Sequence, residues 1–144
     1  EIITEPIRLA LGRLRVIMLH GDLLCTDDHD YQAFRKMVRT PEWQADFLQK
    51  SLADRQKTAE DLRSESTAAM AQKKVEIMDV NNDAVQSCFD RHEVDILIHG
   101  HTHRPGVHHY ARSRTRYVLG DWNPEPSYLS WRDATGFVLH DSRI

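Results

Sequence analysis

Hydrophobic and polar positions divide the chain into strand-like ends and a helical middle. Short runs rich in Val, Ile and Leu predict β-strands at 7–11, 15–19, 94–98, 115–119 and 137–140. Gly12 lies between the first two runs, where it predicts a tight turn that joins them. Strands on both sides of a helical segment indicate an α/β fold with a layered sheet.

The middle of the chain has the composition of helices. Neither glycine nor proline occurs between Pro41 and Gly100. Residues 41–74 are rich in Ala, Glu, Gln, Lys, Arg and Leu, which favour helical structure. We therefore expect two or three helices there, the first of which starts at Pro41 with Thr40 as its N-cap.

Two of the predicted helices carry an apolar face. In the first, Trp43, Phe47 and Leu48 recur at helical spacing. In the last, predicted at 82–92, the apolar residues are Ala84, Val85, Cys88 and Phe89. We expect this second face to pack on the sheet.

Size and composition indicate one domain without affinity for nucleic acid. The 144 residues suit a single core, and a net charge of -3 gives no reason to expect a strongly basic face. Cys25 and Cys88 lack CxxC spacing, which indicates free thiols and a cytoplasmic protein. No apolar run approaches the roughly 18 residues of a membrane span. Because the chain starts at Glu1, directly before a predicted hairpin, we expect it to be part of a longer protein.

Histidines follow a strand-like run at two places in the chain, in HGD at 20–22 and in HGHTH at 99–103. Residues at strand ends reach the edge of a sheet, where α/β folds bind ligands. The glycine in each motif allows the backbone to turn sharply. His101 and His103 are separated by one residue, so they could face one metal ion or two ions about 3.5 to 4 Å apart.

Each motif also has an ordinary structural interpretation. A single histidine at a strand end, such as His20, is commonly a hydrogen-bonded edge residue, and an HxH pair also recurs by chance. The presence of both motifs after apolar strands in one chain favours a metal site, although His99 could point elsewhere. The other histidines are predicted to be surface residues: His29, His92, His108, His109 and His140.

Charged residues near these motifs leave further alternatives open. In CTDDHDY at 25–31, Asp27 or Asp28 can cap a helix or take part in binding. The helical middle carries the cations Arg55, Arg63, Lys73 and Lys74. These side chains can form a solvated face or contact a phosphate group.

HGD at 20–22 and GHTHRP at 100–105 resemble two signature motifs of the calcineurin-like binuclear metallophosphoesterases. Within that superfamily, three longer segments are similar to the enzymes that hydrolyse UDP-2,3-diacylglucosamine, along nearly the whole chain. They are HGDLLCTDDHDYQAFR at 20–35, IMDVN at 77–81 and LIHGHTHRPGVH at 97–108. The resemblance implies the C-terminal part of a four-layer α/β/β/α sandwich, with a helical lid inserted at about 41–76.

The resemblance also implies a set of site residues. His20, His101 and His103 would be the catalytic metal ligands for two Mn²⁺ ions, with His20 and His101 on one ion and His103 on the other. The carboxylate ligands would lie outside this chain, and His99 would not be a ligand. Substrate contacts are implied for Asp28, Ser66, Lys73 and His101, with Tyr31 and Arg63 nearby. Met70 stands where the family has a polar asparagine.

The implied reaction is hydrolysis of the diphosphate of UDP-2,3-diacylglucosamine, an early step of lipid A biosynthesis in Gram-negative bacteria. The products would be UMP and 2,3-diacylglucosamine 1-phosphate, known as lipid X. Because this substrate is a lipid, we expect peripheral contact with the cytoplasmic face of the inner membrane. Two alternatives stay open: a metallophosphoesterase that acts on nucleotides, and an incomplete domain that is inactive as it stands.

Overall fold

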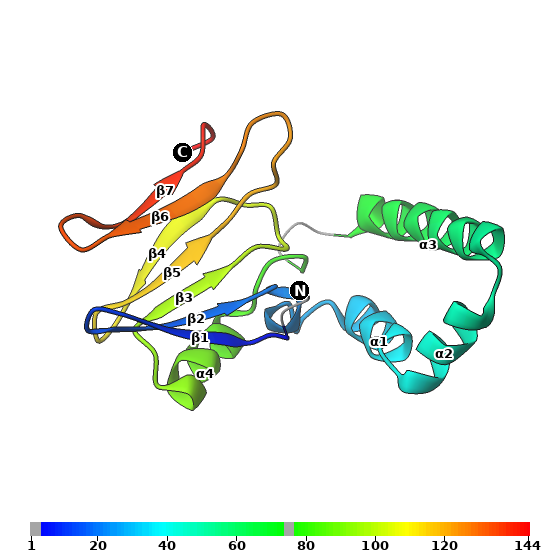
Figure 1. Ribbon diagram of the computed structural model, residues 1–144, viewed down its shortest axis with the longest axis horizontal. Coiled ribbons are helices and arrows are strands. Elements are labelled where there is room, and N and C mark those ends of the chain that lie inside the picture. Colours follow the sequence, from blue (N-terminus) through cyan, green and yellow to red (C-terminus); the bar gives the residue numbers. More distant parts are fainter. Residues whose placement is uncertain (1–3, 74–76) are drawn as a thin grey trace. The chain divides into compact units, whose positions relative to one another are not determined.

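A mixed β-sheet of five strands is the centre of the larger of two units in this computed structural model (Figure 1). The structure describes residues 4–73 and 77–144. We call residues 1–25 and 80–144 the sheet unit, and residues 26–79 the helical unit.

The five-stranded sheet has the strand order β1-β2-β3-β5-β4. Its strands are β1 (Ile7–Leu11), β2 (Leu14–Leu19), β3 (Ile96–His99), β4 (Gly106–Tyr110) and β5 (Arg114–Val118). The three central strands β2, β3 and β5 run parallel, whereas β1 and β4 pair antiparallel at the two edges. A separate hairpin consists of β6 (Tyr128–Arg132) and β7 (Gly136–His140). This mixed sheet with helices confirms the predicted α/β class.

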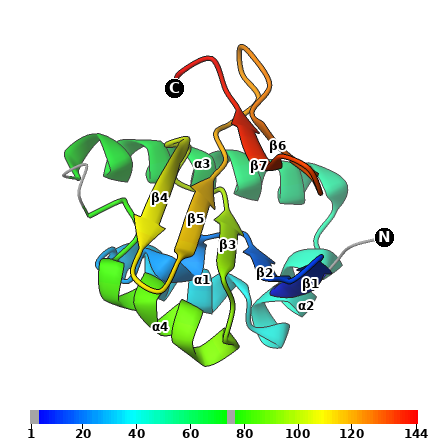
Figure 2. The same cartoon turned by 90° about the vertical axis from the view of Figure 1, so that its left-hand side faces the viewer.

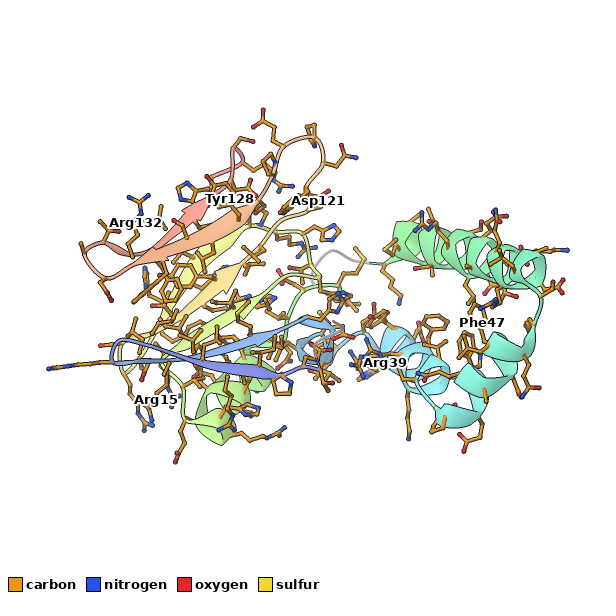
Figure 3. All side chains as sticks on the ribbon, in the orientation of Figure 1. Arg15, Arg39, Phe47, Asp121, Tyr128 and Arg132 are labelled. Carbon is orange, nitrogen blue, oxygen red and sulfur yellow. The ribbon has the colours of Figure 1, made fainter. Side chains whose placement is uncertain are left out.

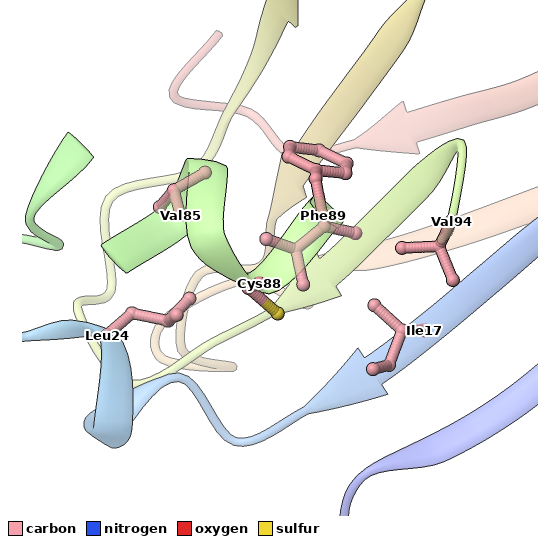
Figure 4. Close-up of a cluster of buried hydrophobic side chains, with 7 residues drawn as sticks. Ile17, Leu24, Val85, Cys88, Phe89 and Val94 are labelled. Atoms are coloured by element: carbon pink, nitrogen blue, oxygen red, sulfur yellow. The ribbon is translucent and has the colours of Figure 1, made fainter. Parts of the chain in front are cut away.

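The two faces of the sheet bury different clusters, because successive strand residues point in opposite directions. On one face, Ile17 of β2 and Leu97 of β3 lie against helix α4 (Asn82–His92). That helix contributes Val85, Cys88 and Phe89 to the buried cluster (Figure 4). The prediction that this apolar helix face packs on the sheet is therefore confirmed.

The opposite face of the sheet carries a second cluster, formed by Val16, Ile96 and Ile98. Leu129 of β6 and Phe137 of β7 pack against this cluster, so the hairpin covers the face that α4 leaves free (Figure 2). The sheet unit thus has three layers, with the five-stranded sheet between a hairpin and a helix.

A short-range cap and a long-range bond fix the start of α4. The side chain of Asn81 accepts hydrogen bonds from the backbone amides of Asp83 and Ala84, at 2.9 and 3.0 Å, as a helix N-cap does. The amide of Asn81 in turn donates to the carbonyl of Leu24, at 2.8 Å. This bond joins the segment where the chain leaves the sheet unit to the segment where it returns to that unit.

The described part of the helical unit contains α1 (His29–Val38), α2 (Pro41–Gln49) and α3 (Leu52–Gln72). Each helix starts at a side chain that accepts a hydrogen bond from its first turn: Asp28, Thr40 and Ser51. In α2, the ring of Trp43 stacks on that of Phe47, with 5.1 Å between the centroids; Phe47 is labelled in Figure 3. None of the described helices combines the length and the apolar character needed to span a membrane. The predicted lid range 41–76 lies within this unit, although its residues 74–76, which include Lys74, lie outside the described part of the chain.

Two strands and two histidines differ from the sequence prediction. β4 and β6 were not expected because their sequences, GVHHY and YLSWR, mix polar with apolar residues and lack a run of Val, Ile and Leu. His92 and His140 are half-buried rather than on the surface. His92 lies 2.9 Å from a guanidinium nitrogen of Arg8, and His140 lies 2.8 Å from the hydroxyl of Ser130. These partners come from other strands, which the local sequence does not reveal.

Candidate functional site

The candidate metal ligands lie at the end of the sheet where β2, β3 and β5 finish. Because these strands are parallel, their carboxyl ends meet at one edge. The loops at 20–25, 100–105 and 119–127 all leave from that edge, which we call the rim, and the first of them contains the short 3-10 helix η1 (Asp22–Leu24). His20 stands in the first loop, and His101 and His103 stand in the second.

The structure brings His20 and His101 into contact. Their ring centroids are 4.8 Å apart, with the rings edge to face. The amide of Gly100 donates to the carbonyl of His20, at 3.0 Å, and so ties the two loops together. His101 and His103 have φ angles of 66° and 53°, in the left-handed region that non-glycine residues rarely adopt. Such local strain is typical of functional sites.

A buried carboxylate contacts the imidazole ring of His20. The Nδ1 atom of His20 lies 3.3 Å from Oδ1 of Asp22, whose side chain is almost fully buried. The same Asp22 oxygen accepts a hydrogen bond from the amide of Leu23, at 3.0 Å. A carboxylate at this position favours the proton on Nδ1, which leaves Nε2 of His20 available as a metal ligand.

His99 is a buried residue that connects the second loop of the rim to β5. Its side chain is fully buried, and its Nε2 lies 3.0 Å from the guanidinium of Arg116. Since arginine can only donate, Nε2 accepts this bond and the proton sits on Nδ1. That proton is donated to the carbonyl of Gly100, at 2.9 Å. Both ring nitrogens are thus engaged within the protein.

Gly21 is required by the close approach of the two loops. Its φ angle is 113°, a conformation that side chains with a Cβ rarely adopt. A Cβ atom at this position would lie 2.8 Å from Nδ1 of His99 and 3.0 Å from the carbonyl oxygen of Gly100. The HGD motif therefore needs its glycine for packing as well as for the turn.

The residues present fit one part of a metal site. Within the described residues, no group of three or more His, Cys, Asp or Glu side chains is arranged to hold a metal ion. His20 and His101 together offer two nitrogen donors. Between the candidate ligands of the second loop, the Thr102 hydroxyl is buried and lacks a hydrogen-bond partner among the described residues.

In the helical unit, the structure brings three of the candidate substrate residues together. Oδ1 of Asp28 accepts a hydrogen bond from the backbone amide of Tyr31, at 3.0 Å, and lies 2.5 Å from the ammonium of Lys73. Asp28 is therefore both the N-cap of α1 and an ion-pair partner. Lys73 also lies 3.9 Å from a carboxylate oxygen of Asp30.

The other two candidates lie on α3. Arg63 and Ser66 are exposed and lie three residues apart, with Met70 four residues further on. At this spacing all three share one face of the helix. Met70 is half exposed, so an apolar side chain stands on this face where the resemblance implies a polar asparagine.

An ionic cluster next to the rim was not found in the sequence. Arg143 hydrogen-bonds to the carboxylates of Asp121 and Asp141 and to the backbone carbonyl of Asp121. These bonds hold the pKa of Asp121 below its ordinary value, and hold that of Asp141 far below it with a further hydrogen bond from Ser127. Arg143 and Asp121 are far apart in sequence, and neither stands in a recognisable motif.

The cluster predicts a loss of stability in acid. Because the pKa values of Asp121 and Asp141 are lowered in the folded state, the unfolded chain binds more protons below about pH 4, so the free energy of unfolding falls as the pH falls. We expect Arg143→Met to flatten this dependence in denaturant unfolding between about pH 5 and pH 2. Arg132→Met, which removes an exposed arginine of β6, is the matched control. Equal slopes in the two variants would contradict the assignment.

Comparison with known proteins shows what the chain resembles. No family profile matches it. The UDP-2,3-diacylglucosamine hydrolase of Bordetella pertussis is 49% identical over 126 residues, which make up 85% of this chain and 49% of that protein. The hydrolase of the same name from Aromatoleum aromaticum is 44% identical over 137 residues, or 93% of this chain and 56% of that protein. The UDP-2,3-diacylglucosamine hydrolase of Klebsiella pneumoniae is 46% identical over 131 residues, which make up 89% of this chain and 55% of that protein.

The chain thus spans about half the length of the curated relatives that it matches. The similarity extends over most of this chain, and it confirms the resemblance that the HGD, IMDVN and GHTH segments indicate.

Proposed function

We propose, from the similarity of the chain to about half of a UDP-2,3-diacylglucosamine hydrolase, that it is one part of an enzyme with that activity. The reaction is hydrolysis of the substrate's diphosphate to UMP and 2,3-diacylglucosamine 1-phosphate, for lipid A biosynthesis. The observation that carries the proposal is an identity of 44 to 49% with such hydrolases over 85 to 93% of the chain. The contact of His20 with His101 at the rim supports it, because both histidines lie in matching motifs.

For the metal centre we propose two Mn²⁺ ions. His20 and His101 would hold one ion and His103 the other, with the remaining ligands supplied by the rest of the protein. When bound, the two ions supply an activated water and neutralise negative charge on the reacting phosphoryl group. Asp22 orients His20, and His99 holds the Gly100 carbonyl and thereby the loop that carries the other two ligands.

For substrate binding we propose the residues of the helical unit that the resemblance implies. The ammonium of Lys73 is held by Asp28 and is suited to contact a phosphate or sugar oxygen. Tyr31, Ser66 and Arg63 would complete these contacts.

The same unit would shelter the acyl chains and touch the cytoplasmic face of the inner membrane. The exposed apolar side chains of Leu48, Leu52 and Met70 support this part of the proposal, because exposed apolar side chains are suited to contact with acyl chains.

We further propose that the sheet unit supplies three layers of a four-layer α/β/β/α sandwich. The hairpin β6-β7 packs face to face with the five-stranded sheet, which is the arrangement of the two inner layers. The outer helical layer on the hairpin side, and further strands, would come from the remainder of the protein.

The proposal is tested with the full-length protein and a panel of phosphoanhydrides. With Mn²⁺ present, we expect UMP release from UDP-2,3-diacylglucosamine, and no release when EDTA removes the metal. Comparable kcat/KM values for UDP-sugars without acyl chains or for dinucleoside polyphosphates would instead favour a nucleotide hydrolase. Residues 1–144 alone are expected to be inactive, because the described residues offer no complete metal site. Turnover by this isolated chain would contradict the incomplete-site interpretation.

A further inference from the structure

The loop between β5 and β6 presents an exposed indole. The side chain of Trp122 is 73% exposed, the most exposed aromatic side chain among the large hydrophobic residues of the described chain. Its Nε1 atom donates a hydrogen bond to the carbonyl of Ser127, at 2.8 Å. The ring is thus held by its polar edge while its flat faces are open to solvent.

The loop that carries Trp122 is braced from both of its ends. Ser127, itself buried, accepts a hydrogen bond from the amide of Gly120 through its hydroxyl, at 2.8 Å. On the other side, Arg143 binds both the carboxylate and the backbone carbonyl of Asp121. A ring fixed in this way loses little conformational freedom when a ligand stacks on it.

This loop leaves the sheet beside the loop that carries the candidate metal ligands. β5 pairs in parallel with β3, and the amide of Leu119 donates to the carbonyl of His99, at 2.8 Å. Asp121 is labelled in Figure 3 on the loop that follows β5. Because Arg143 neutralises Asp121, this carboxylate does not set a free negative charge next to the indole.

We infer that Trp122 stacks on the uracil base of the substrate and so contributes to recognition of its nucleotide half. The inference rests on the proposed function, since that substrate contains one flat aromatic group, the uracil, next to the diphosphate that would react at the rim. The remaining parts of the substrate are sugars, phosphates and acyl chains, none of which offers a π face. A face of an indole is suited to a nucleobase, and stacking on an aromatic side chain stabilises each base by an amount that corresponds to roughly 10- to 100-fold in affinity.

The first test is a kinetic comparison in the full-length protein. For Trp122→Ala, we expect KM for UDP-2,3-diacylglucosamine to rise roughly 10- to 100-fold with kcat nearly unchanged, because the stack is present in both the ground state and the transition state. Trp122→Phe retains an aromatic face and should recover most of the affinity. Tyr128→Ala, which removes another exposed aromatic side chain from the adjoining strand β6, is the matched control with an unchanged KM. If Trp122→Ala has the wild-type KM, the inference is wrong while the proposed function stands.

A second measurement does not depend on turnover. UMP should quench the tryptophan fluorescence of the full-length protein in a saturable manner, whereas ribose 5-phosphate, which lacks the base, should not. The UMP-dependent quench should be lost in Trp122→Phe even though this variant still binds UMP. A quench that survives in Trp122→Phe, or one of equal size with ribose 5-phosphate, would overturn the inference. Absence of hydrolysis in a protein that shows the expected quench would instead refute the proposed function.

Discussion

Replacement of His101 by alanine should abolish nearly all Mn²⁺-dependent hydrolysis of UDP-2,3-diacylglucosamine by the full-length protein. The expected decrease in kcat/KM is on the order of 10³-fold or more, because loss of a metal ligand removes several kcal/mol of transition-state stabilisation. His20→Ala should have a similar effect, since the two imidazoles lie side by side at the rim. The measurement is UMP release at saturating Mn²⁺, together with thermal unfolding to verify that each variant folds.

His92→Ala is the matched control for these variants. His92 ends α4, on the side of the sheet unit from which β3 starts, whereas the rim lies where β3 finishes. We therefore expect a small loss of stability, from the lost contact with Arg8, and unchanged turnover. An active His101→Ala variant, or an equally inactive His92→Ala variant, would contradict the assignment of His101 to the metal centre.

Gly21→Ala is the second substitution with a large expected effect. The added methyl group meets the ring of His99 and the carbonyl of Gly100, and the backbone is held at a φ angle unfavourable for alanine. Strain and overpacking together should lower the free energy of unfolding by about 2 to 5 kcal/mol. Activity should fall further than stability alone explains, because the two loops that carry the candidate ligands are pushed apart. Urea unfolding and kcat measured on the same preparation would show both effects.

Gly136→Ala is a control that distinguishes the steric clash expected in Gly21→Ala from the backbone strain. Gly136 also has a positive φ angle, 72°, yet a Cβ atom there would meet nothing within 4 Å. This variant should lose only about 1 to 2 kcal/mol. If Gly21→Ala is no more destabilising than Gly136→Ala, the close approach at the rim does not constrain residue 21.

The sequence is informative where a local pattern decides the structure. The apolar runs place β2 and β3, and the helical spacing of Val85, Cys88 and Phe89 gives both the existence and the buried face of α4. Thr40 and Pro41 mark the start of α2. Parallel pairing of β2 with β3 then brings His20 and His101 to one edge.

Features that depend on distant partners could not be predicted in this way. β4 owes its structure to pairing with β5, and not to an apolar pattern of its own. Arg143 lies next to Asp121 because the intervening hairpin β6-β7 returns the end of the chain to the rim. The proton position on His99 depends on Arg116, a residue from the next strand. In each case the deciding contact joins segments that no local pattern relates.

The hydrogen bond between the Asn81 amide and the Leu24 carbonyl makes the helical unit an insertion with closed ends. Once the two ends of an insertion are held together, its length and composition have only a small effect on the stability of the host, because the entropy of loop closure grows slowly with length. The sheet unit and its rim can therefore stay constant while the inserted helices change. If the helical unit binds the substrate, as we propose, exchange of residues 26–79 between related proteins is a direct route by which one scaffold acquires a new substrate.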